Sequence, residues 1–213
     1  MITLHFAPLT RSIRIMWLLE ELSISYKIQP VVFNASAAKG YAQDTPSGKL
    51  PAIEDGDIIV SESGAIVEYV LERYGNGRLA PTFGSPERAR YLEWLHFAEA
   101  TAAAPINMLV SLTVYRAEAD KYTELVDHLR SSVAQHFDRI ETALSKSPYL
   151  IGSEFSAADI MIGFTLWSAK MIGLLGDQHP RTSAYLQRLR TRRSFTKALD
   201  ESRRLSSQLG PSS

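Results

Sequence analysis

The hydrophobic pattern of this chain changes its period once, and that change restricts the folds open to it. Apolar residues alternate as in strands only before residue 61, in the segments 2–6, 26–33, 51–54 and 57–60. After the Gly- and Pro-punctuated stretch 77–84, every apolar pattern has helical spacing. The sequence therefore predicts a small α/β domain over residues 1–76, a linker over 77–85 and an all-helical domain over 86–213.

The predicted order of elements in the first domain is β-α-β followed by β-β-α. A helix over residues 11–22 separates the first two strands, which predicts a parallel pair with a right-handed crossover. Asp55-Gly56 lies between the last two strands and indicates a hairpin turn, because both central residues of that turn adopt positive φ. A further helix over 61–74 completes the domain.

Several local signals mark the helices of the second domain. Ser85-Pro86 is typical of a helix start, and Pro105 is expected to kink or break the helix that follows. Apolar residues keep helical spacing from 126 to 144. Ser156 and Asp159 are spaced as a capping box at the start of another helix.

Charge and composition exclude several classes of function. The 23 basic and 23 acidic residues cancel, so there is no long-range field to attract nucleic acid or an anionic membrane. The chain has no cysteine, which excludes disulfides, thiolate-metal sites and a cysteine nucleophile. We find no metal-ligand spacing, no secretory signal and no run approaching the ~18 apolar residues that span a bilayer. We therefore expect a soluble cytoplasmic protein without a metal.

Four segments resemble the cytosolic glutathione S-transferases in order and spacing. They are residues 9–22, 48–53, 62–66 and 155–160. The resemblance implies a thioredoxin-like N-terminal domain that holds glutathione and a helical C-terminal domain that supplies an apolar acceptor pocket. It also implies a homodimer with a role in detoxification. The motifs are most similar to bacterial and fungal members whose catalytic group is a hydroxyl.

The second segment implies contacts to the cysteinyl and glycyl parts of glutathione. A residue before proline is held extended, so Leu50 can offer its backbone N–H and C=O to the cysteinyl unit. In the family the proline that matches Pro51 is cis. Lys49, and also Lys39, could face the glycyl carboxylate. The alternatives are an ordinary strand start at Pro51 and two solvated lysines.

The third segment implies contacts to the γ-glutamyl end. A helix N-terminus with the Ser63 hydroxyl suits the carboxylate, and Glu62 suits the ammonium group. The alternative is that both are ordinary first-turn residues.

The first segment implies the group that activates the thiol. The family's hydroxyl matches Thr10, and Ser12 is the second candidate. Many relatives have Asn-Ser where this chain has Leu9-Thr10, although threonine carries the same hydroxyl. Helix capping is the alternative for both side chains.

Phe97, Met108 and Tyr115 lie where relatives line the acceptor pocket, with the protein core as the alternative for each. The leading hypothesis is that a bound glutathione thiolate attacks a small apolar electrophile. Two others stay open: a glutathione-dependent peroxidase or disulfide reductase, and a non-catalytic protein that binds ligands or assembles.

Overall fold

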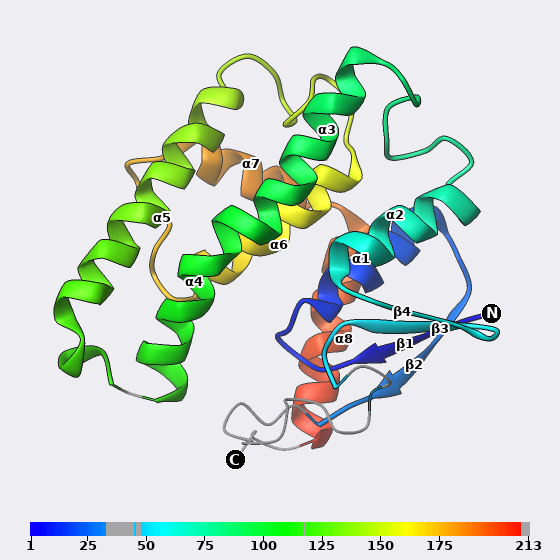
Figure 1. Ribbon diagram of the computed structural model, residues 1–213, viewed down its shortest axis with the longest axis horizontal. Helices are drawn as coiled ribbons and strands as arrows, with labels where there is room; N and C mark the ends of the chain where they lie inside the picture. The colour runs from blue at the N-terminus through cyan, green and yellow to red at the C-terminus, as the bar shows by residue number, and fades with distance from the viewer. Residues whose placement is uncertain (33–44, 46–47, 117, 210–213) are drawn as a thin grey trace. The chain divides into compact units, whose positions relative to one another are not determined.

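The computed structural model describes residues 1–32, 45, 48–116 and 118–209. The described residues form two compact units (Figure 1), one from those within 1–78 and 190–209 and the other from those within 79–189. Lys39, predicted to face the glycyl carboxylate, lies outside the described residues.

The first unit contains a four-stranded mixed sheet with the order β2-β1-β3-β4. The strands are β1 (Ile2–Phe6), β2 (Tyr26–Pro30), β3 (Ala52–Asp55) and β4 (Ile58–Ser61). β1 pairs parallel with β2, and β3 is antiparallel to both β1 and β4. With α1 (Ser12–Leu22) and α2 (Ser63–Tyr74), this confirms the predicted β-α-β, β-β-α order and the thioredoxin-like fold class.

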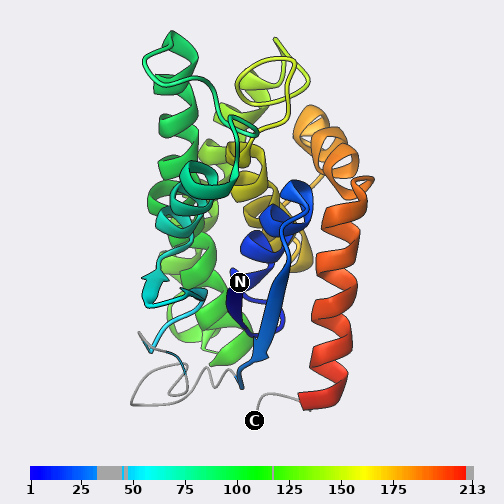
Figure 2. The ribbon, with the colours of Figure 1, turned by 90° about the vertical axis from the view of Figure 1, so that its right-hand side faces the viewer.

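Helix α1 is buried on nearly every side because three partners cover it. They are β1 of the sheet, α2, and α8 (Arg193–Leu209), which packs along it (Figure 2). The rings of Trp17 and Phe195 stack at 4.0 Å between centroids with planes 12° apart. We predicted residues 86–213 as one helical domain, whereas the packing places residues 190–209 in the first unit.

The second unit is helical. Its long helices are α3 (Pro86–His96), α4 (Ala103–Val110), α5 (Thr123–Ala143), α6 (Ala157–Met171) and α7 (Pro180–Arg190). Short segments are η1 (Phe97–Ala102), η2 (Ser111–Tyr115) and η3 (Ala119–Lys121). At the start of α6 the predicted capping box is confirmed, since Asp159 accepts the N–H of Ser156 at 2.8 Å.

Pro105 does not break the helix that contains it. Residues 86–115 form one continuous helix, in which the π-helical segment η1 comes directly before α4. A wider π turn accommodates a residue that lacks an N–H and whose ring would clash with the carbonyl four residues earlier. Of the two predicted outcomes, the break is therefore wrong, and the kink stays a prediction.

The same helix qualifies by length and composition as a candidate membrane span, which we did not expect from the sequence. However, 44% of its most apolar window is buried inside the protein, and a core helix passes the same test.

Candidate functional site

Three loops that carry predicted site residues leave the sheet at the same end. In the strand register, Ala52 at the start of β3 lies between His5 on β1 and Ser61 on β4. The segment before Ala52 therefore lies beside the segments that follow β1 and β4. Those segments hold Leu50-Pro51, Thr10 and Glu62-Ser63, so the topology brings the three motifs together.

The segment before β3 presents backbone at this end of the sheet. The Leu50–Pro51 peptide bond is cis, as the resemblance implied, and Pro51 is buried while Leu50 is half-buried. Thr45 donates its hydroxyl to the Lys49 carbonyl at 3.1 Å, which closes the preceding turn. The Lys49 side chain is exposed.

Glu62 has an unusual backbone at the junction between β4 and α2. Its φ is 71° and its ψ is 119°, a backbone conformation that residues other than glycine rarely adopt. Such a conformation costs about 1–3 kcal/mol and is commonest at ligand-binding sites. It turns the chain sharply, so that the next residue, Ser63, begins α2 with its side chain buried.

Arg14 is a site residue that the sequence analysis did not single out. Its side chain is fully buried on α1, and its Nη1 donates to Ser63 Oγ at 3.0 Å. The bond ties the first turn of α1 to the first residue of α2. A signal was present in the sequence, because a charged residue between Ile13 and Ile15 interrupts an apolar segment.

The two candidate hydroxyls form one local network after β1. Thr10 donates its hydroxyl to the Ala7 carbonyl at 2.8 Å and accepts the Ser12 N–H at 3.2 Å. Ser12 Oγ lies 3.0 Å from Thr10 Oγ1 and is fully buried, whereas Thr10 is partly exposed. Of the two hydroxyl residues, Thr10 is therefore the more accessible to solvent, and Ser12 supports the turn.

The helices give this end of the sheet a positive potential. Both α1 and α2 begin here, at Ser12 and Ser63, and helix N-termini carry partial positive charge on their N–H groups. The buried guanidinium of Arg14 adds a full charge. The arrangement suits a ligand with carboxylates or a thiolate.

The predicted acceptor residues, all in the second unit, differ in exposure. Phe97 is buried against the rings of Trp94 and His136, at 5.3 and 5.6 Å between centroids, so it is a core residue. Met108 and Tyr115 are 48% and 53% exposed. Of the three predicted acceptor residues, Met108 and Tyr115 are accessible to an apolar molecule and Phe97 is not.

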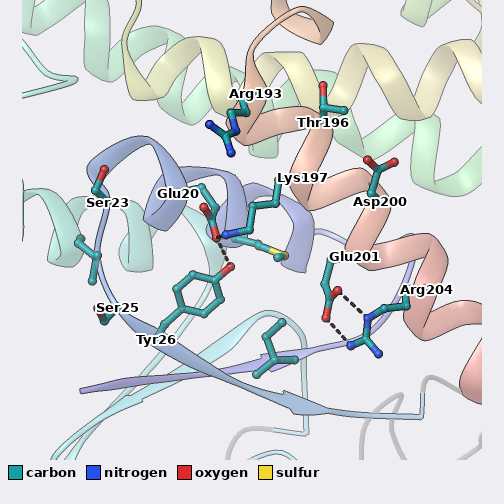
Figure 3. A pocket seen from close by; sticks show the side chains of 13 residues that line it. Glu20, Ser23, Ser25, Tyr26, Arg193, Thr196, Lys197, Asp200, Glu201 and Arg204 are labelled. Atoms are coloured by element: carbon teal, nitrogen blue, oxygen red, sulfur yellow. Dashed lines mark hydrogen bonds and ion pairs between the residues drawn. The ribbon is translucent and has the colours of Figure 1, made fainter.

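A separate hollow of about 1230 Å³ lies between α1, β2 and α8 (Figure 3) and contains none of the predicted site residues. Glu20 accepts the Tyr26 hydroxyl at 2.6 Å and pairs with Lys197 at 2.7 Å. Burial, and then the bond to Glu20, raise the pKa of the Tyr26 phenol well above its usual range. Arg204 pairs with Glu201 in the same way, so these charges neutralise one another.

Within the part of the chain that the structure describes, no three His, Asp or Glu side chains are grouped as metal ligands.

Comparison with known proteins identifies the family. Residues 1–72 match the N-terminal domain of glutathione S-transferases and residues 123–188 match their C-terminal domain. Glutathione S-transferase F10 of Arabidopsis thaliana is 30% identical over 195 residues, covering 84% of this chain and 85% of its own. Glutathione S-transferase 3 of Schizosaccharomyces pombe is 29% identical over 181 residues, covering 80% and 75% of the two chains.

A solved structure agrees with these matches. Glutathione transferase URE2P8 from Phanerochaete chrysosporium, determined with oxidized glutathione, superposes with a TM-score of 0.83 at 26% identity and covers 97% of this chain and 96% of its own. Both halves of the sequence and the fold thus point to the same enzymes, and the chain belongs to the glutathione S-transferase family.

Proposed function

We propose that this transferase binds glutathione at the end of the sheet where the three loops meet, and activates its thiol for attack on a small apolar electrophile. The observation that carries the proposal is the register of β3. It sets the segment before Ala52, which holds Leu50-Pro51, next to the segments that follow β1 and β4, which hold Thr10 and Glu62-Ser63.

Each part of glutathione has a matching group. The half-buried Leu50 can pair its backbone N–H and C=O with the cysteinyl unit, as one strand pairs with another. The N–H groups at the start of α2, with Ser63, suit the γ-glutamyl carboxylate, and Glu62 suits the ammonium. The exposed Lys49 suits the glycyl carboxylate, and Lys39 remains a proposal from the resemblance alone.

The chemical task is to ionise a thiol. A free thiol with a pKa of about 8.5 is only a few per cent thiolate at pH 7, and each unit of depression is worth about 1.4 kcal/mol. Thr10 stands just before α1 and is the accessible hydroxyl. Donating to sulfur requires its proton to leave the Ala7 carbonyl, a rotation about one side-chain bond. Met108 and Tyr115 have the exposure that contact with an apolar electrophile needs.

The test is Thr10→Ala, assayed with a halodinitrobenzene as a general electrophile. We expect kcat to fall at least about tenfold, because a hydrogen bond to a charged group is lost, while glutathione still binds by calorimetry. Thr10→Ser, which keeps the hydroxyl, should retain activity. Unchanged turnover in Thr10→Ala would move the role to Ser12 or to backbone amides.

Peroxide and mixed-disulfide substrates belong in the same assay panel. The chain has no cysteine, so such reductions would need two glutathione molecules. We propose a homodimer and a cytoplasmic location on the resemblance alone, and sedimentation equilibrium tests the former.

A further inference from the structure

The loop before Thr10 is held from the other end of the chain. Leu9 has a φ of 60°, in the left-handed region, which is unfavourable for a leucine. Its side chain is 57% exposed, so side-chain packing gives little reason for this conformation. Its backbone N–H, however, donates to Ser202 Oγ at 3.0 Å, a bond across 193 positions of sequence.

Ser202 is a rigid acceptor because α8 is fixed against α1. Its side chain is buried at 1% exposure. Near the start of α8, Arg192 makes two bonds to the Glu21 carboxylate, at 2.6 and 2.8 Å. One turn further, Lys197 pairs with Glu20 (Figure 3), and the Trp17 and Phe195 rings stack in between.

We propose that Ser202 is a positioning residue for Thr10: it holds Leu9 in the left-handed conformation and thereby aims the Thr10 hydroxyl at the bound sulfur. The proposal rests on the function proposed above. Leu9 and Thr10 share a peptide unit, so a change in the backbone dihedrals of Leu9 redirects everything that follows it. The network from Thr10 to Ala7 and Ser12 depends on that direction.

The first test is Ser202→Ala, with Ser207→Ala as the matched control. Ser207 is an exposed serine of the same helix that donates only to the Arg204 carbonyl among the bonds described. In Ser202→Ala we expect kcat to fall about fivefold, the size of one lost hydrogen bond, with the KM for glutathione nearly unchanged. The acid limb of the kcat–pH profile should move to higher pH, because a misdirected hydroxyl stabilises the thiolate less. An unchanged profile beside a lower melting temperature would overturn the proposal, since a purely structural role predicts that pair.

The second test is a double-mutant cycle with Thr10→Ala. If Ser202 acts through Thr10, then Ser202→Ala costs no further activity once the hydroxyl is gone. Equal losses in both backgrounds would overturn the positioning role. A large effect of Thr10→Ala with none of Ser202→Ala overturns only this inference. No effect of Thr10→Ala moves the activating role to Ser12 or to backbone amides and removes this inference, whereas the proposed function fails only if the unaltered protein does not bind glutathione.

A third measurement keeps the inference testable if Ser202→Ala does not fold. Amide hydrogen exchange in the unaltered protein should show Leu9 protected, as expected for a bonded N–H in an otherwise exposed residue. An unprotected Leu9 amide would contradict the bond itself.

Discussion

Ser63 accepts a hydrogen bond from a buried charge and is also proposed to meet the ligand. Arg14 is fully buried, and an arginine in that position is costly unless its N–H groups find acceptors. Ser63 Oγ is one of them, at 3.0 Å. The same oxygen can still donate its own proton, which leaves the hydroxyl free to bond a carboxylate. The arginine thus fixes the side chain that the ligand is proposed to meet.

This double role gives the first prediction, on Ser63→Ala. We expect the free energy of unfolding to fall by about 1–3 kcal/mol, because Arg14 loses an acceptor in a buried site, and glutathione to bind about tenfold more weakly. Denaturant unfolding and calorimetry measure the two effects. Ser61→Ala, an equal change two residues earlier on β4, is the control. Weaker binding with unchanged stability would show that Arg14 does not depend on this bond.

For single residues, the sequence predicted at which end of the sheet they lie but not with which residues they form hydrogen bonds. The motifs indicated which residues follow each strand, and Thr10, Leu50 and Ser63 lie at one end of the sheet as that topology requires. The resemblance ranked Thr10 before Ser12, but the sequence did not predict their exposure, because that depends on how the loop folds back on itself. It also missed the bond from Arg14, which joins residues 49 positions apart.

Among the elements, the Glu21 carboxylate of α1 gathers donors from α1 and from the start of α8. Glu21 accepts from Trp17 Nε1 at 3.0 Å and from Arg192 Nε at 2.6 Å, and Ser194 also donates to it. Burial alone would raise the pKa of this carboxyl, but the three donors outweigh burial and lower it below the usual value of 4.5. The ionised carboxylate therefore stabilises the packing of α8 on α1.

The second prediction follows from the sign of that shift. A pKa lower in the folded than in the unfolded state stabilises the protein above the unfolded value and stops doing so as pH falls through the folded one. Glu21→Gln should therefore cost about 2 kcal/mol at pH 7 and progressively less below about pH 4.5. Denaturant unfolding between pH 7 and 3 measures this.

Glu72→Gln, on the exposed side of α2, is the control for that prediction and should change stability little at any pH. A cost for Glu21→Gln that stays constant with pH would show that the charge of Glu21 is irrelevant and only its shape matters.

Pro105 shows where prediction at the scale of elements fails. The expectation of a break assumed α-helical hydrogen bonding, in which a proline removes one bond and clashes with a carbonyl. The π-helical η1 before α4 changes that bonding, and the helix continues to Tyr115. Local propensity does not encode this exchange, because it depends on the neighbouring helices that hold the segment in place.

At the scale of the whole molecule, the first unit is not contiguous in sequence. The change of hydrophobic period near residue 77 marks its first boundary, and the chain returns to it at residue 190. An amphipathic helix shows that it has a partner but not which one. The buried stripe of α8, with Phe195, Leu199 and Leu205, would suit either unit by composition. The stacking of Phe195 on Trp17 places α8 with the first unit, and this contact is visible only in the structure.

The third prediction tests this division with two substitutions that should loosen different units. Phe195→Ala removes the ring stacked on Trp17, which should cost about 3–5 kcal/mol and speed amide exchange in residues 1–78 and 190–209. Asp159→Ala removes the buried acceptor of the Tyr185 hydroxyl and the Leu150 N–H, at 2.6 and 3.1 Å, and should act on residues 79–189. Hydrogen exchange followed by mass spectrometry resolves both. If Phe195→Ala instead loosened mainly residues 79–189, α8 would belong with the helices, as the sequence pattern alone suggested.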